Sequence, residues 1–400
     1  MIAIYTLTSA LHNEEAVAAV TQEFLGSLGL DYTLKGADYK DYGDADLNLI
    51  YVRTGGTEGV FKPMLADLLA RSPQPFYLLT SGKSNSLAAS MEILSFLRQQ
   101  GIPGEILHGK PAYIRERVQL LETLEMARKS LRGKRFGVIG KPSDWLIASQ
   151  ADTYALSSRL GLTIREIPMK ELLEEIERLP EDPVMARVTC GTPLFDAAEP
   201  VKAAAPGAYR IYQALQVLVG RYQLSGLTLR CFDLLGAVQN TGCLALAKLN
   251  EEGIVATCEG DIPAMLTMAI AQALTGVTGF QANPSRIDPD TGEVLFAHCT
   301  VPLNMVTRYA FDTHYESGIG VGIRGHVQEG PVTVFKVAGD LSRHFAAEGT
   351  LLRNLAQPDL CRTQVVLHLD DVSYFLTNPI GNHHIIVPGH CKKLIDALLA

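Results

Sequence analysis

The sequence lacks the cysteine arrangements that build zinc ribbons and disulfide frameworks. Seven cysteines occur among its 400 residues, and no two of them form a C-x-x-C pair. Both kinds of site need regular cysteine spacing. We therefore expect most of the cysteines to be free and buried as small apolar side chains, as in a protein of a reducing compartment.

Long apolar runs and an excess of positive charge are also missing. No segment approaches the roughly 18 uninterrupted apolar residues that a membrane-spanning helix requires. The N-terminal segment has no basic leader and no long apolar core, which argues against a signal peptide and predicts a cytoplasmic protein. The net charge of −8 argues against non-specific binding to nucleic acid. Neither a membrane nor a nucleic acid is therefore expected as a partner.

The fingerprints of nucleotide-binding loops are absent as well. No G-x-G-x-x-G motif follows an early strand-like run. Residues 81–84 read S-G-K-S and end like a phosphate-binding loop, but Tyr77 stands where the first glycine of G-x-x-x-x-G-K-[ST] should be. We therefore expect no nicotinamide or nucleotide cofactor.

Length and periodicity indicate an α/β protein of several domains. A chain of 400 residues with 47% hydrophobic and 20% charged residues is globular and too long for one ordinary core. Strand-like and helix-like runs alternate through residues 1–132 and again through residues 133–289, which predicts two doubly wound, Rossmann-like parallel-sheet domains. Residues 290–400 carry short β-like runs separated by glycine turns, which predicts a β-rich, antiparallel barrel-like C-terminal domain with a terminal helix. The β-like runs expected there are residues 301–306, 318–325, 331–338, 364–369 and 373–376.

Residues 258–302 concentrate the side chains that could bind a metal ion. Glu259 and Asp261 directly precede a long apolar run of helical character. Asn283 follows in a segment rich in turn-forming residues, and His298 closes a strand-like run. Hard oxygen ligands together with an imidazole suit a divalent cation such as Mn²⁺ or Mg²⁺.

Each of these residues also has a purely structural interpretation. Glu259 and Asp261 could cap the helix that follows, because acids are favoured at helix starts. Asn283 suits a turn, and a buried histidine is more often a hydrogen-bonded core residue than a ligand. Asp233, just past an expected strand at residues 227–232, could line a site or cap the next helix.

The C-terminal segment adds a second group of histidines. His383, His384 and His390 are three of the ten histidines of the chain and lie within eight residues of one another. Such clustering is hard to explain as ordinary surface composition. Spacing alone leaves open which of the three faces a site.

These segments resemble those of the L-fucose isomerase and L-arabinose isomerase superfamily of metal-dependent sugar isomerases. The E-G-D of residues 259–261 is similar to the segment that carries the first acidic metal ligand, and F-Q-A-N at residues 280–283 to the segment with the second. The F-A-H-C-T-V-P run around His298 resembles the segment with the arabinose enzyme's histidine ligand. The N-H…G-H pattern of residues 382–390 resembles the fucose enzyme's segment and implies His383, whereas the arabinose enzyme's double histidine favours His384.

The resemblance, which is concentrated in residues 225–302 and 378–400, implies an architecture, a cofactor and a reaction. It implies two α/β domains followed by a β-rich domain, and a homo-oligomer (trimer or hexamer) with the site near a subunit interface. It also implies Mn²⁺, or another divalent cation such as Mg²⁺ or Co²⁺. The implied reaction interconverts an aldose and a ketose through an enediolate. Which sugar is used, and whether it carries a phosphate or a sulfonate, does not follow.

One departure from the family pattern concerns proton transfer. Asn283 stands where the family has a second carboxylate, and an amide can bind a hard cation but cannot act as an acid or base near neutral pH. Glu259 would then move the proton, helped by Asp261 or Asp233, or would act alone. Two alternatives remain open: a metal-dependent sugar aldolase or lyase, and a catalytically silent sugar-binding relative.

Overall fold

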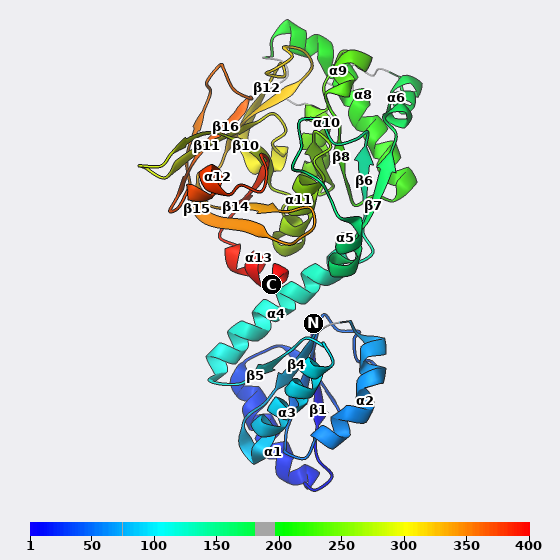
Figure 1. Ribbon diagram of the computed structural model, residues 1–400, viewed down its shortest axis with the longest axis vertical. Helices are drawn as coiled ribbons and strands as arrows, with labels where there is room; N and C mark the ends of the chain where they lie inside the picture. The colour runs from blue at the N-terminus through cyan, green and yellow to red at the C-terminus, as the bar shows by residue number, and fades with distance from the viewer. Residues whose placement is uncertain (74, 181–196) are drawn as a thin grey trace. The chain divides into compact units, whose positions relative to one another are not determined.

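The computed structural model describes residues 1–73, 75–180 and 197–400 and contains two compact units (Figure 1). The first unit is Met1–Lys129 and the second is Ser130–Ala400. Cys190 lies outside the described residues.

The first unit is a doubly wound parallel sheet, as the alternating pattern predicted. Its strand order is β2-β1-β3-β4-β5, and every pairing in it is parallel. Helices α2 and α3 pack on one face in a shared apolar core, whereas α1 and α4 contact the other face through Tyr51 and Tyr77. The elements are β1 (Ile2–Leu7), α1 (Glu14–Leu28), β2 (Tyr32–Gly36), β3 (Leu47–Val52), α2 (Glu58–Arg71), β4 (Phe76–Leu79), η1 (Lys83–Asn85), α3 (Ser86–Gln99), β5 (Gly104–Leu107) and α4 (Pro111–Leu131).

The second unit begins with another parallel sheet, of four strands in the order β7-β6-β8-β9. Buried side chains of α6, α8 and α10 form one apolar core with this sheet. The strands are β6 (Arg135–Ile139), β7 (Thr163–Ile167), β8 (Gly226–Leu229) and β9 (Val255–Cys258). The helices are α5 (Thr153–Leu160), α6 (Met169–Arg178), α8 (Glu199–Tyr222), α9 (Asp233–Val238), α10 (Cys243–Glu251) and α11 (Ile262–Thr275).

A closed barrel follows, and all its pairings are antiparallel, in the order β10-β11-β16-β15-β14-β17. Its strands are β10 (Phe280–Asp288), β11 (Glu293–His298), β14 (Gly330–Val337), β15 (His344–Leu355), β16 (Thr363–Leu369) and β17 (His384–Pro388). The remaining elements are η3 (Leu303–Met305), the paired strands β12 (Val306–Asp312) and β13 (Gly322–Val327), α12 (Ser373–Thr377) and the terminal helix α13 (Lys392–Leu399). The barrel confirms the prediction of an antiparallel, barrel-like C-terminal region. That region was expected to begin at residue 290, but the first barrel strand, β10, begins at Phe280.

Three local predictions are wrong. Asn283 lies inside β10, opposite Ala297, and a register shift next to Pro284 lets the strand continue past the proline. Residues 373–376 are helical because the Asp371 carboxylate accepts the Ser373 backbone N–H at 2.8 Å and starts a turn. Residues 301–306 form a 3₁₀ turn that leads into β12 and not a strand.

Other differences concern strand ends and omissions. The strand expected at residues 227–232 ends at Leu229, so Asp233 is the first residue of α9. The sequence pattern also missed β2, β12, β15 and β17. Most residues of β2, β12 and β15 are only half-buried or exposed, so these strands lack the apolar run by which buried strands were found. β17 is buried apart from Pro388, but its segment was noted only for its histidines.

The cysteines behave as their irregular spacing predicted. The six described cysteines are free thiols, and all but Cys361 are buried. Among the described helices, none is both long enough and apolar enough to cross a membrane.

Candidate metal centre

A sharp backbone turn between β9 and α11 places the acidic residues of the site. Cys258 ends β9, and the next two residues, Glu259 and Gly260, both have positive φ values of 67° and 70°. The left-handed conformation is costly for a residue with a side chain, and such strain is often found at functional sites. Backbone hydrogen bonds from Ser143 N to the Glu259 carbonyl (2.9 Å) and from Gly260 N to the Leu229 carbonyl (3.0 Å) hold the turn.

Gly260 is required by both conformation and space. A Cβ atom built on it would lie 2.5 Å from the carbonyl oxygen of Lys141 and 2.8 Å from Cα of Pro142. Gly276, at the end of α11, has a similar φ of 78° but no atom within 4 Å of such a Cβ. Comparing the two glycines therefore separates backbone strain from steric overlap.

We expect Gly260→Ala to destabilise the protein much more than Gly276→Ala. Gly276→Ala should cost about 1–2 kcal/mol from the left-handed backbone alone. Gly260→Ala should cost about 1–3 kcal/mol more because the backbone of the 141–142 segment must move. Urea unfolding of both variants measures the difference, and equal free energies of unfolding would contradict the packing argument.

Three buried side chains from separate elements converge next to this turn. Glu259, His298 and His383 each offer one ligand atom, and these atoms all lie within 4.8 Å of one another. Glu259 follows β9, His298 ends β11, and His383 directly precedes β17, so the parallel sheet and the barrel both contribute. The two imidazole rings have centroids 5.4 Å apart and an interplanar angle of 69°. We call this group the Glu259–His298–His383 cluster.

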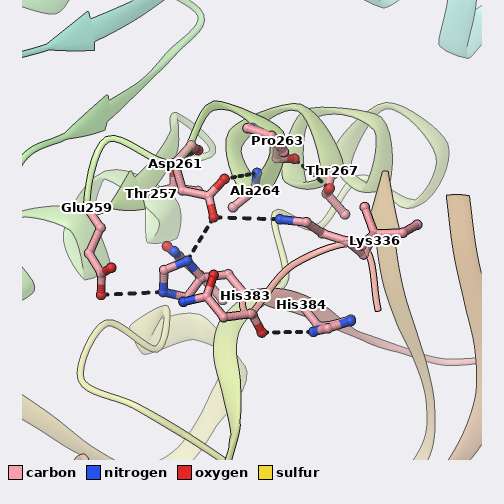
Figure 2. A network of polar contacts seen from close by, with 12 residues as sticks. Thr257, Glu259, Asp261, Pro263, Ala264, Thr267, Lys336, His383 and His384 are labelled. Atoms are coloured by element: carbon pink, nitrogen blue, oxygen red, sulfur yellow. Dashed lines mark hydrogen bonds and ion pairs between the residues drawn. The ribbon is translucent and has the colours of Figure 1, made fainter. Parts of the chain in front are cut away.

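A carboxylate behind His383 fixes the orientation of its ring (Figure 2). Its Nδ1 lies 2.9 Å from Asp261 Oδ2, and because the Asp261 carboxylate only accepts, Nδ1 carries the proton. Its Nε2 is buried, has no hydrogen-bond partner among the described residues, and lies 3.5 Å from Glu259 Oε1. A carboxylate that fixes the tautomer and leaves the other ring nitrogen for a metal is the usual environment of a histidine ligand.

His298 is held as a neutral imidazole. Burial lowers its pKa to about 3, and the nearby His383 acts in the same direction. The Thr300 hydroxyl lies 2.9 Å from His298 Nδ1. When that nitrogen donates to the hydroxyl, Nε2 keeps its lone pair for a cation.

The charges of Glu259 and His383 depend on each other. Burial alone would raise the pKa of Glu259, but the ion pair with His383, together with the hydrogen bond from the Trp145 indole, holds it at about 2. Burial alone would lower the pKa of His383, but Asp261 and Glu259 raise it to about 9. Without a cation, the site therefore holds a carboxylate and an imidazolium near neutral pH, and a bound cation would replace the proton.

The donor set fits a divalent cation. Two imidazoles and a carboxylate are a donor set that divalent transition ions accept. Asn283 Oδ1 is a further buried oxygen with no hydrogen-bond partner among the described residues. A buried acceptor of this kind calls for a donor or a cation that the protein alone does not supply.

The structure does not bring His384 or His390 into the cluster. His384 donates from Nδ1 to the Asn382 carbonyl (3.0 Å), and its Nε2 lies 3.1 Å from the Tyr374 hydroxyl. Its ring packs among aromatic side chains, including Phe375. The His390 side chain is 53% exposed. Of the three clustered histidines, only His383 has a free nitrogen facing Glu259.

The two aspartates predicted as proton relays occupy structural positions. Asp261 is fully buried, accepts the Ala264 backbone N–H at 2.8 Å as the cap of α11, and accepts from His383. Both of its oxygens are therefore engaged. Asp233 begins α9, and its partly exposed carboxylate accepts from Arg230 at 3.0 Å instead of contacting the cluster.

Sequence comparison relates the chain to sugar isomerases, although no protein-family model matches it. It is 26% identical over 266 residues to the sulfoquinovose isomerase of Priestia aryabhattai, which covers 64% of this chain and 59% of that protein. It is 23% identical over 261 residues to the sulfoquinovose isomerase of Alkalicoccus urumqiensis, which covers 63% and 59%. The match to the sulfoquinovose isomerase of Clostridium sp. (strain MSTE9) is 26% over 241 residues, which covers 59% and 50%.

This chain is similar to sulfoquinovose isomerases. It spans less than two thirds of the length of these relatives, between 50% and 59%. The similarity agrees with a buried cluster of polar ligands and with the sugar-isomerase resemblance of the sequence segments that form it.

An aromatic wall beside Glu259 was not anticipated from the sequence. The Trp145 indole N–H donates to Glu259 Oε2 at 2.6 Å. Trp145 meets Phe232 edge-on with centroids 5.0 Å apart, and Phe232 meets His314 in the same way at 5.6 Å. One feature of the sequence could have drawn attention to Trp145: it is the only tryptophan, and it lies shortly after the end of β6. His314, between β12 and β13, offered no such signal.

We expect Trp145→Phe to impair the site without unfolding the protein. The variant loses the hydrogen bond to Glu259 but keeps an aromatic ring next to Phe232. Because the Trp145 residue is 52% exposed, the free energy of unfolding should change by less than about 1 kcal/mol. The affinity for Mn²⁺ should fall by about tenfold or more, since partners that orient a metal ligand have effects of this size. Calorimetric titration with Mn²⁺ measures this, and an unchanged affinity would show that the indole does not orient Glu259.

Proposed function

We propose that the protein is a metal-dependent aldose–ketose isomerase whose active site is the Glu259–His298–His383 cluster. The observation that carries the proposal is the buried convergence of these three side chains, with His383 Nε2 left free and facing Glu259 at 3.5 Å. Similarity to enzymes named sulfoquinovose isomerases supports a sugar as the substrate. In this proposal the three residues hold Mn²⁺, Mg²⁺ or Co²⁺, and Asn283 contributes its amide oxygen.

A bound divalent cation would supply Lewis-acid polarisation of the sugar carbonyl and stabilise the enediolate. Glu259 would take the proton from C2 of the open-chain aldose and return it to C1, while the hydroxyl proton moves from O2 to O1 of the enediol, which yields the ketose without a redox cofactor. Glu259 Oε1, 3.5 Å from His383 Nε2, is the oxygen that would bind the cation, which leaves Oε2, held in place by the Trp145 indole, to move the proton.

Glu259 is proposed to move the proton alone. Asp261 has both oxygens engaged by Ala264 and His383, and Asp233 is paired with Arg230. Asn283 cannot exchange a proton near neutral pH. A single carboxylate that serves both carbons is therefore the arrangement best supported by the contacts.

Solvent deuterium exchange tests the proposed reaction. Protein purified with Mn²⁺ would be incubated in D₂O with sulfoquinovose, a neutral aldohexose, an aldopentose and a hexose 6-phosphate. Deuterium at C2 of the recovered aldose, together with ketose product, is expected for one of these sugars. The sulfonated hexose is the first candidate because the named relatives act on it.

The same experiment separates the other candidate functions. A metal-dependent aldolase or lyase would give shorter carbon chains in place of the ketose. A silent sugar-binding relative would give no exchange with any sugar despite saturable binding, an outcome that the amide at Asn283 and the engaged aspartates would explain. We also propose a homo-oligomer, trimer or hexamer, which light scattering of the purified protein tests.

A further inference from the structure

A buried lysine lies behind the metal centre and has no role in the reaction as proposed. Lys336 is on β14, and its side chain is 1% exposed. Its Nζ has no hydrogen-bond partner among the described residues, and the carboxylate oxygen Asp261 Oδ2 lies 3.6 Å away (Figure 2). A buried ammonium is tolerated only when an opposite charge compensates it.

The surroundings of Lys336 point to Asp261 as the group that compensates it. The flanking strand residues Val334, Phe335 and Val337 are fully buried and apolar. His384 does not compensate the lysine, because its ring nitrogens contact the Asn382 carbonyl (3.0 Å) and the Tyr374 hydroxyl (3.1 Å). Asp261 is 0% exposed, and its burial would favour the protonated acid unless a cation were close.

Asp261 links the lysine to the metal centre. Its Oδ2 is shared by Lys336 Nζ and His383 Nδ1, while its Oδ1 accepts the Ala264 backbone N–H. The carboxylate is thus fixed from three directions, by a helix start, a strand residue and the histidine. Lys336 itself is not among the side chains that converge on the cluster, so any effect on the metal centre passes through Asp261.

We propose that Lys336 is a positioning residue: by anchoring the Asp261 carboxylate, it fixes the His383 ring with its Nε2 toward Glu259. The proposal rests on the metal centre described under the proposed function. Removing Lys336 leaves Asp261 with the helix cap and His383 only, so the carboxylate and the ring it holds gain freedom. Loss of such a supporting contact costs about 10- to 100-fold in metal affinity.

The direction of the change distinguishes positioning from a simple charge effect. Taking a positive charge away from the neighbourhood of a cation site would raise the affinity for Mn²⁺ if only long-range electrostatics mattered. If Lys336 positions Asp261 and His383, its removal should instead lower the affinity for Mn²⁺. A measured affinity therefore discriminates between the two roles without reference to catalytic activity.

The experiment compares Mn²⁺ dissociation constants of metal-free protein by calorimetry or by the free-ion electron paramagnetic resonance signal. Lys336→Met is expected to bind Mn²⁺ about 10- to 100-fold more weakly than the wild type. The matched control is Lys248→Met, which removes another buried lysine, 3.7 Å from Glu251, and should leave the affinity unchanged. An affinity within about threefold of the wild type, or a higher one, would overturn the role of Lys336.

A second comparison covers the case in which Lys336→Met fails to fold. Asp261→Asn removes the buried carboxylate and favours the neutral amine form of the buried Lys336, and the double variant Asp261→Asn/Lys336→Met removes both groups. Since Lys336 acts through Asp261, the two variants should bind Mn²⁺ with affinities within about threefold of each other. A lower affinity for Mn²⁺ in the double variant than in Asp261→Asn would contradict the claim that Lys336 acts through Asp261. Absence of Mn²⁺ binding in the wild type would instead overturn the metal centre itself.

Discussion

Glu259→Gln is expected to abolish stoichiometric Mn²⁺ binding and the proposed isomerase activity while leaving the protein folded. The substitution keeps the size of the side chain but removes the only carboxylate of the Glu259–His298–His383 cluster. It also removes the group proposed to move the proton, a role worth about 10²- to 10⁴-fold in rate. Asp261 still pairs with His383, so the histidine does not lose its second charged partner.

Metal analysis after gel filtration and the deuterium-exchange assay measure the two effects separately. Asp233→Asn is the informative comparison, because the Asp233 carboxylate pairs with Arg230 and is not among the side chains that converge in the cluster. That variant should still bind one equivalent of Mn²⁺. Retention of stoichiometric, tight Mn²⁺ by Glu259→Gln would refute the assignment of Glu259 as a ligand.

The affinity for Mn²⁺ is expected to rise steeply with pH until about pH 9. The pKa of His383, which burial alone would lower, is raised to about 9 by Asp261 and Glu259, so a proton occupies the ligand nitrogen at neutral pH. Since a metal must displace that proton, the affinity should increase about tenfold per pH unit between pH 7 and pH 9 and then level off. His298, with a pKa of about 3, and Glu259, at about 2, do not titrate in this range.

The stability of the metal-free protein should change with pH in the opposite direction. A histidine whose folded-state pKa lies above its ordinary value of 6.5 stabilises the folded state fully below about pH 6.5. That contribution is lost as the pH rises through about 9. Calorimetric titrations from pH 6 to pH 9.5 and thermal melts of the metal-free protein measure both trends. His383→Gln is the control and should remove the slope of stability with pH; an affinity independent of pH between 7 and 9 would contradict the charged state of His383.

The fold class could be predicted from the sequence because the parallel sheets and the barrel have different sequence patterns. Helices separate the apolar runs of the parallel sheets, whereas glycine turns separate the short β-like runs of the barrel. Strands such as β1 and β3 are buried on both faces and appear as apolar runs, which helices separate. β15 escaped notice because its exposed and half-buried residues lack such a run, even though it pairs with strands on both sides. Asp371 shows a related limit, since its carboxylate accepts the Ser373 backbone N–H in a turn that precedes a helix where a strand was expected.

The site was predictable only in part. Glu259 and His298 could be predicted as members of the cluster because ligand-type residues stand out just after β9 and at the end of β11. His383 came from a resemblance, and only the hydrogen bonds of the folded chain separate it from His384. Trp145 and Lys336 reach the site through contacts between distant segments. No local spacing rule encodes a contact of that kind, so a single sequence does not reveal it.

A crystal structure of the protein soaked with Mn²⁺, with anomalous data collected near the manganese edge, would show whether the Glu259–His298–His383 cluster binds the metal. We expect a single strong anomalous peak within bonding distance of His383 Nε2 and of the Glu259 and His298 side chains. The Nδ1 of His383 should still face Asp261. A peak at His384 or elsewhere, or no peak beside Glu259 at saturating Mn²⁺, would contradict this assignment.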